Sequence, residues 1–201
     1  KKHLEKVADK EGFELDAGSA ELLSLLADGS FRDALGELQK VLNFIGKDKK
    51  TRLDPLRREA SSARLVKRED IEGITGAPKT ALVNDFLSAI VEKDLEKGIK
   101  AIKKASEDNL DMRLYFKLII EKMRVAIILR YAPKLKDEMA GDIGEADLEF
   151  LQTLVKEDKD GMLRSAQLSI MLEEYQNLNN AFIAELPLEL ALIRIINKDN
   201  Q

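Results

Sequence analysis

The chain lacks most of the side chains on which catalytic and metal sites depend. It contains no cysteine and a single histidine, His3. The absence of cysteine excludes structural disulfides, thiolate nucleophiles and zinc–thiolate sites, and one histidine excludes a multi-histidine metal site. No apolar run approaches the roughly 18–20 residues that cross a bilayer, and no signal peptide is recognised at the start. We therefore expect no metal site and no membrane partner.

Proline, glycine and aromatic residues are also scarce, and this indicates helix. The 201 residues include 4 Pro and 11 Gly, and aromatic residues make up 5%. The apolar residues are mostly Leu, Ile and Ala, which favour helix over strand. Hydrophobic residues reach 44% and charged residues 35%, with a net charge of −4, as is typical of a soluble helical protein. The slight acidic excess argues against a dedicated nucleic-acid binder, and the lack of cysteine agrees with a cytoplasmic location.

The first part of the chain, residues 1–76, shows short helical patterns. A helix ends near Gly12, a second begins at Asp16 or Ser19, and a third runs from Ser30 to Gly46. The stretch at about 47–66 is highly charged, poor in apolar residues and contains proline, which predicts a mobile loop. A short helix, "REDIEGITG", follows. These elements predict a small domain of three or four helices.

Residues 77–197 show longer helical patterns with few interruptions. Helices are predicted over 80–93, after Asp94, over 110–132, over 144–157, over 160–186 and over 186–197. Residues 110–132 are so apolar that we expect a central, mostly buried helix. Pro187 fits just inside the start of the last helix. No strand is predicted anywhere, so the sequence indicates an all-α protein with a second domain of five or six helices.

Motifs for independent catalysis are missing. The sequence has no GxxxxGK[ST] phosphate loop and no GxGxxG turn. His3 lies in a terminal helix without a serine triad, and no Glu-x-x-His pair exists for a helical di-metal site. Carboxylates such as Glu92, Asp94 and Glu96 fit solvated helical faces. We expect no activity from this chain alone, whatever a longer parent protein performs.

Arg32 is unusual because it occupies the first turn of a predicted helix. Ser30 is a good N-cap, and Asp33 stands three residues later, as in a capping box. Asp33 suits the positive end of the helix dipole, whereas Arg32 does not. Arg32 is therefore either a neutral surface residue or a group aimed at an anion that this chain does not supply.

The segment "GSFRDALGEL" resembles the sensor-2 segment of AAA+ clamp-loader ATPases, and most closely that of the bacterial DNA polymerase III gamma/tau subunits. The family pattern G-S-x-R-D-A-L-x-x-L is matched through Leu38, and the chain departs from it at Gln39 and Lys40. "VKREDIEGITG" resembles the helix that closes the family's lid. "ALVNDFLSAIVEKDLEKGIKAI" and "LPLELALIRI" resemble the start and the last helix of its collar domain.

The resemblance implies a lid at residues 1–76 and a collar, or oligomerisation, domain at 77–197. It implies that Arg32 reaches the phosphates of ATP, held with Mg²⁺ by an ATPase domain of the parent protein that is missing here. An arginine offers planar charged donors suited to phosphate oxygens, and a helix start favours the same anion. Implied partners are other clamp-loader subunits through the collar, the sliding clamp and primed DNA through the full assembly, and a homo-oligomer is a further possibility.

Alternative interpretations stay open. A stand-alone helical protein-interaction adaptor would leave Arg32 without a nucleotide role, and another AAA+ lid would explain the first domain but not the second.

A basic run on the helix after Asp94 suits a solvated face or a phosphate-backbone contact. The last helix is apolar around most of its circumference, which fits either core or a subunit interface. The run consists of Lys97, Lys100, Lys103 and Lys104.

Overall fold

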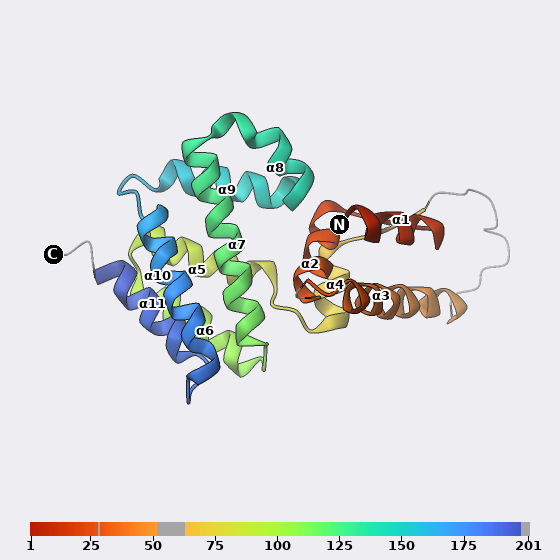
Figure 1. Cartoon of the computed structure of the whole chain (residues 1–201), viewed down its shortest axis with the longest axis horizontal. Helices are drawn as coiled ribbons and strands as arrows, with labels where there is room; N and C mark the ends of the chain where they lie inside the picture. The colour runs from red at the N-terminus through yellow and green to blue at the C-terminus, as the bar shows by residue number, and fades with distance from the viewer. Residues whose placement is uncertain (28, 52–62, 198–201) are drawn as a thin grey trace. The chain divides into compact units, whose positions relative to one another are not determined.

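The computed structural model describes residues 1–27, 29–51 and 63–197. The chain divides into two compact units, Lys1–Ala77 with Asp142–Gly144 and Pro78–Gly141 with Glu145–Gln201. Each unit is built almost entirely of helices (Figure 1). The predicted all-α class is therefore confirmed.

The first unit packs four helices around a small apolar core. They are α1 (Lys2–Lys10), α2 (Ala17–Leu26), α3 (Phe31–Thr51) and α4 (Arg68–Thr75). The Asp16 carboxylate accepts a hydrogen bond from the Ser19 N–H at 2.6 Å, so this residue caps α2 as the sequence predicts. Gly76 ends α4 with a φ of 72°. The fully buried side chains include Leu22, Leu23, Leu38, Val41 and Ile71.

The prediction that the chain has no strands is wrong. β1 (Phe13–Leu15) and β2 (Arg64–Val66) form a parallel two-stranded sheet in which Leu15 is the partner of Val66. The Ser19 hydroxyl, itself buried, donates to the Val66 carbonyl at 2.9 Å. Strands of three residues carry too few positions to show alternation, and their pairing depends on contacts far apart in sequence.

The third helix is longer than predicted. Gly46 does not end it, because α3 continues to Thr51. A glycine inside a helix costs only about 1 kcal/mol relative to alanine, and Val41, Leu42 and Ile45 are buried on the turns before it. The prediction of a loop at 47–66 is therefore wrong at both ends, because α3 occupies its start and β2 its end. The part of this prediction at 52–62 lies outside the described residues.

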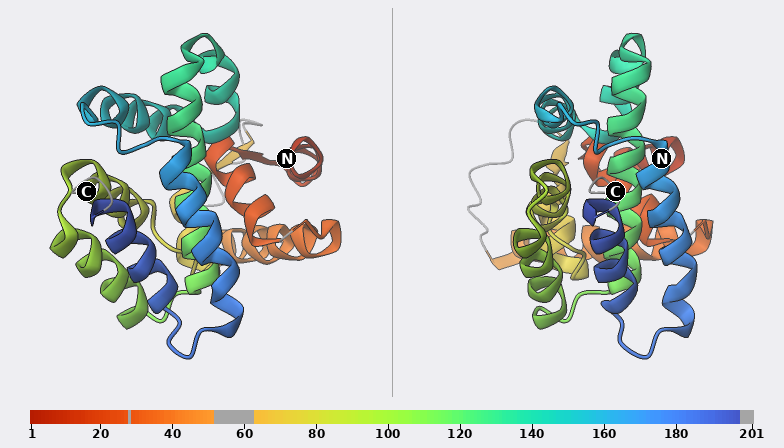
Figure 2. Two further views of the ribbon diagram at one scale, coloured as in Figure 1. Left: turned by 60° about the vertical axis from the view of Figure 1, so that its left-hand side comes forward. Right: turned by 90° about the vertical axis from the view of Figure 1, so that its left-hand side faces the viewer.

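The second unit is a bundle around a central helix. Its helices are α5 (Thr80–Glu92), α6 (Leu95–Glu107), α7 (Met112–Tyr131), α9 (Glu145–Glu157), α10 (Ser165–Asn177) and α11 (Leu186–Asn197). As predicted, α7 is mostly buried, and it packs against α5, α9 and α10 (Figure 2). α11 packs against α6 and α10. Tyr115 and Phe116 of α7 and Phe86 of α5 are the largest fully buried side chains.

Acidic caps start two of these helices. Asp94 accepts from the Lys97 N–H at 2.9 Å at the start of α6, as predicted. Asp111 accepts from the N–H groups of Arg113 and Leu114 at the start of α7. Because both carboxylates take helix N–H groups that lack a carbonyl partner, they fix where α6 and α7 begin.

Three details differ from the sequence prediction. A short helix, α8 (Lys136–Ile143), follows a 3₁₀ turn at Pro133–Leu135 and was not predicted. The helix predicted over 160–186 is α10 alone, followed by a second 3₁₀ turn at Leu178–Asn180. Asparagine competes for backbone hydrogen bonds, so the run of asparagines from Asn177 favours this end. Pro187 lies within the first turn of α11, as predicted.

Candidate functional site

The start of α3 presents the residues that the sequence singled out. Gly29, with a φ of 84°, turns the chain into the helix. The Ser30 hydroxyl accepts from the Asp33 N–H at 3.3 Å, so Ser30 acts as the predicted N-cap. The capping box is only half formed, because the Ser30 N–H donates instead to the Ala27 carbonyl at 2.8 Å. Asp33 therefore serves the helix dipole rather than closing the box.

Arg32 is exposed at this helix start. Its side chain makes no hydrogen bond or ion pair with any residue that the structure describes. An exposed guanidinium keeps its charge and its planar set of donors available to an anion. The positive end of the α3 dipole favours an anion at the same place. The position of Arg32 is therefore compatible with phosphate recognition.

A hollow of about 180 Å³ lies at the start of α3 within the first unit, and Arg32 is not among the residues that line it. Leu4, Ala27, Phe31 and Ala34 give it an apolar wall. His3 also lines it, and its ring meets Phe31 edge to face at a centroid distance of 4.7 Å. From the sequence, His3 was interpreted only as a residue of a terminal helix, because nothing in the local pattern pairs it with Phe31.

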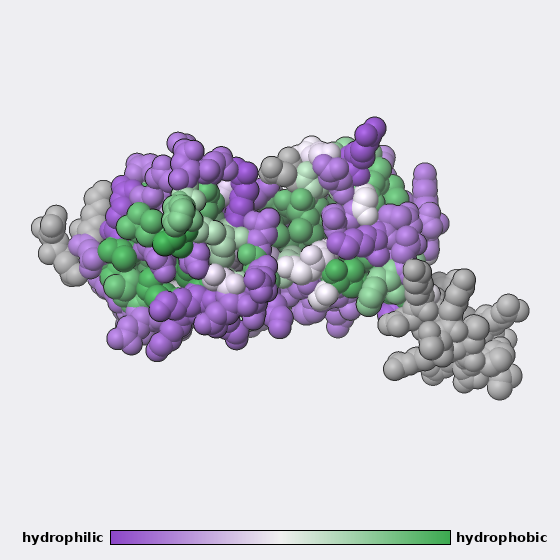
Figure 3. Space-filling model, turned by 90° about the horizontal axis from the view of Figure 1, so that it is seen from below, coloured by the Kyte–Doolittle hydropathy of each residue, from purple (hydrophilic) through white to green (hydrophobic). Residues whose placement is uncertain are grey.

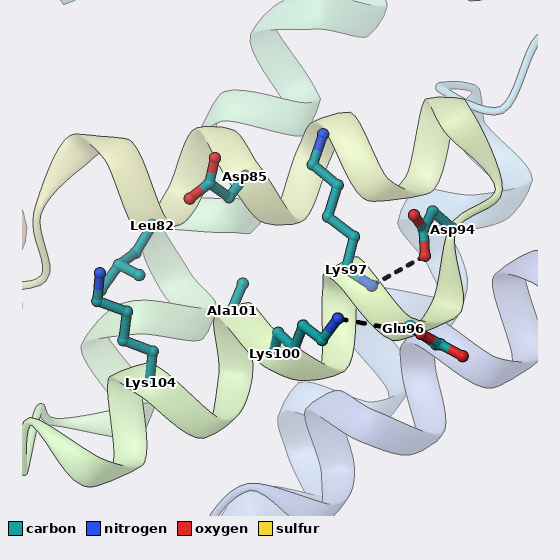
Figure 4. A pocket seen from close by; sticks show the side chains of 8 residues that line it. All are labelled: Leu82, Asp85, Asp94, Glu96, Lys97, Lys100, Ala101 and Lys104. Carbon is teal, nitrogen blue, oxygen red and sulfur yellow. Dashed lines mark hydrogen bonds and ion pairs between the residues drawn. The ribbon is translucent and has the colours of Figure 1, made fainter.

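The basic run on α6 faces acidic residues. Lys97 Nζ lies 2.8 Å from Glu92, and Lys100 Nζ lies 3.9 Å from Glu96. A pocket of about 350 Å³ between α5 and α6 brings three of the lysines near Asp85, Asp94 and Glu96 (Figure 4). Since positive and negative groups alternate here, the geometry favours the solvated face over a contact with a phosphate backbone.

α11 presents apolar side chains on two faces. Leu188, Ala191, Leu192 and Ile195 are buried in the bundle. Leu186, Leu190 and Ile193 remain exposed on the same helix, preceded by Ile183 and by the fully exposed Phe182. In the view of Figure 3, hydrophobic residues reach the surface in patches between hydrophilic ones. We call Ile183, Leu186, Leu190 and Ile193 the α11 stripe.

Two buried ion pairs hold the second unit together and were missed from the sequence. Lys122 Nζ lies 2.6 Å from Asp147 and donates to the Asn84 side chain at 2.8 Å. Asp158 pairs with Arg130 and also accepts from the N–H groups of Met162 and Leu163. A lysine inside the apolar pattern of α7 was the available signal for the first pair. Buried charges require such partners, so these are structural residues.

The buried tyrosine at the centre of the second unit, Tyr115, also has a hydrogen-bond partner for its hydroxyl. The Tyr115 hydroxyl donates to the Leu82 carbonyl at 2.9 Å. Burial, with a smaller contribution from the negative charge of Asp85, raises the pKa of Tyr115 above its usual value. Tyr115 therefore stays neutral and acts as a core residue.

Metal-binding clusters and membrane-spanning helices are both absent from the described part of the chain. No group of three or more His, Asp or Glu side chains there is arranged to hold a metal ion. No helix there is both long and apolar enough to span a bilayer.

Comparison with known proteins connects the chain with bacterial clamp loaders. No family model matches it. It is 23% identical over 133 residues to the DNA polymerase III subunit tau of Bacillus subtilis, covering 66% of this chain and 21% of that protein. The chain thus spans about a fifth of that relative's length.

The fold leads to the same group of proteins. The DNA clamp loader delta protein (YqeN) of Bacillus subtilis superposes with a TM-score of 0.50 at 14% identity, covering 97% of this chain and 55% of that one. The predicted resemblance to clamp-loader subunits is confirmed by this weak sequence similarity and shared fold.

Proposed function

We propose that this chain is the lid and collar portion of a clamp-loader subunit. The observation that carries the proposal is the agreement between two independent comparisons. The sequence is similar to a tau subunit, and the fold is similar to a delta protein over nearly the whole chain. The two compact helical units supply the parts that such a portion needs.

The second unit is the part that assembles with other subunits. Its core is closed by Phe86, Tyr115 and Phe116, so the bundle is internally complete. The α11 stripe nevertheless leaves large apolar side chains exposed. Such a stripe on an otherwise well-buried bundle is typical of an interaction surface. Through this unit the chain joins its fellow subunits, and through the assembly it acts on the sliding clamp and primed DNA.

The first unit senses nucleotide through Arg32. In the parent protein an ATPase domain binds ATP with Mg²⁺, and the γ-phosphate region supplies the negative charge. The exposed guanidinium of Arg32, at the positive end of α3, fits that charge. Because α3 forms part of a small compact unit, a contact between Arg32 and the phosphates would move the lid as one body when the nucleotide changes. Such a movement is a hinge-type switch. The first unit thus couples nucleotide state to assembly in the cytoplasm.

Catalysis belongs to the missing ATPase domain under this proposal. Within the described residues, Arg32 can donate hydrogen bonds to a phosphate, but no cluster of carboxylates is arranged to bind Mg²⁺. In this proposal the residues of the chain bind the phosphates and couple the nucleotide state to the lid, and they do not activate water.

The test of nucleotide sensing is the substitution Arg32→Ala in the full-length parent protein. ATP-dependent loading of the clamp onto primed DNA should fall by about tenfold or more, because a charged phosphate contact is lost. Association with the other subunits should not change. Lys40→Ala is the matched control, because Lys40 is a cation on the same helix that pairs with Glu37 at 3.4 Å.

Loading that is equal for Arg32→Ala and Lys40→Ala would contradict the sensing role. If, in addition, the chain bound no clamp-loader subunit, the stand-alone adaptor would replace the proposal.

A further inference from the structure

The small sheet of the first unit has a free edge along β2. The Arg64 N–H donates to the Gly12 carbonyl at 3.2 Å. The Val66 carbonyl accepts from the Asp16 N–H, also at 3.2 Å. Both residues of β2 therefore turn their backbone groups toward β1. Because successive residues of a strand address opposite edges, the N–H and the carbonyl of Leu65, which lies between them, point away from β1.

The backbone groups on this edge are available for pairing. Since the peptide bond is planar and trans, the Ala63 carbonyl points away from β1 as well. The outward groups of Ala63 and Leu65 have no hydrogen-bond partner in the part of the chain that the structure describes. The edge ends at Lys67, whose N–H donates to the Asp70 carboxylate at 3.0 Å. An extended segment laid along β2 can pair with these groups, as in strand addition.

The side chains on the outer face of β2 indicate what that segment carries. Leu65 is 46% exposed, and Lys67, exposed and extended two residues later, lies on the same face. Glu14 also belongs to this face, as the partner of Leu65 on β1. A strand added beside β2 lies one strand spacing, about 4.8 Å, farther from Glu14 than β2 does. The added strand therefore meets an apolar side chain and a positive charge first.

We propose that the free edge of β2 binds an extended acidic segment of a partner protein as a third strand. An apolar residue of the segment lies beside Leu65, and a carboxylate lies beside Lys67. A second copy of β2 fits poorly, because its own Arg64 and Lys67 bring like charges to the same edge. This inference goes beyond the proposed function, since it involves neither Arg32 nor the α11 stripe.

The first experiment titrates the chain with the peptide acetyl-Asp-Thr-Val-Thr-Asp-amide and follows backbone amides by NMR. This peptide places its valine beside Leu65 and an aspartate beside Lys67 in either strand direction. Near saturation, hydrogen exchange of the Leu65 amide should slow by about tenfold, because its N–H enters a hydrogen bond. The matched control is acetyl-Lys-Thr-Val-Thr-Lys-amide, which should bind about fivefold or more weakly because like charges meet across the strands.

The second experiment changes the edge itself. Leu65→Pro removes the outward N–H, and proline suits an edge position whose N–H does not serve the ladder. Leu65→Ala is the matched control, because it loses the same side chain and keeps the N–H. The proline variant should bind the acidic peptide about fivefold more weakly than the alanine variant. Lys67→Glu, which leaves the backbone unchanged, should reverse the preference between the acidic and the basic peptide. Circular dichroism shows whether each variant is folded.

Failure of the acidic peptide to bind, or equal binding by Leu65→Pro and Leu65→Ala, would overturn the inference. A peptide preference that Lys67→Glu leaves unchanged would overturn the acidic character of the partner. Self-association of the chain that Leu65→Pro abolishes and Leu65→Ala retains would assign the edge to a second copy instead. Each of these results would leave the proposed function standing.

Discussion

Two paired cations inside the second unit contrast with one exposed arginine of the first unit. In the second unit, Lys122 and Arg130 are paired with Asp147 and Asp158, whose side chains are almost entirely buried. In the first unit, Arg32 is exposed and has no partner among the described residues. The first unit can also bury an arginine, since Arg68 bridges Glu21 at 3.1 Å and Glu72 at 3.3 Å.

The difference separates charges that hold the fold from a charge available for binding. A buried charge without a counter-charge is costly, so a stable core demands partners for Lys122, Asp158 and Arg68. An exposed cation carries no such demand. Arg32 is placed where a helix start already favours an anion. Its exposure at this helix start is what makes it a candidate for binding a ligand.

The largest effect should come from breaking a buried pair in the second unit. Asp158→Ala removes the partner of Arg130 and the acceptor of the Met162 and Leu163 N–H groups. Urea denaturation should show a loss of about 3–5 kcal/mol in the free energy of unfolding. Asp160→Ala is the control, because its 2.9 Å pair with Lys93 is on the surface and should be worth less than about 1 kcal/mol. Equal losses for the two variants would show that Asp158 is not a structural anchor.

A smaller effect on the free energy of unfolding should come from replacing one glycine in each unit by alanine, with opposite signs in the two units. A methyl group on Gly98 of α6 would collide with the fully buried Leu192 of α11, so Gly98→Ala should destabilise the chain by about 1–2 kcal/mol. Gly36 of α3 has open space around it, and Gly36→Ala should stabilise by about 0.5–1 kcal/mol. The same denaturation experiment measures both. Opposite signs support the close α6–α11 packing, and a stabilising Gly98→Ala would contradict it.

Local signals in the sequence predicted much of the fold. Asp16, Ser30 and Asp94 cap helices as predicted, because a cap depends on a few neighbouring residues. The apolar pattern also predicted α7 as the central helix. The position of Arg32 at the start of α3 followed from the same local rules.

Features that depend on distant partners could not be predicted. β1 and β2 pair across more than forty intervening residues, and neither strand has a pattern of its own. The partners of Lys122 and Asp158 come from other helices and turns. The extension of α3 past Gly46 was missed because glycine was given more weight than it carries inside a long helix.

The measurement that tests the central claim most directly is association with clamp-loader subunits. The chain would be mixed with the purified clamp-loader subunits of its own organism and followed by sedimentation velocity, with Leu190→Asp run in parallel. We predict a faster boundary that contains the chain together with another subunit. If the folded chain sedimented as in isolation in every mixture, at the highest concentrations, the assignment to a clamp loader would be contradicted.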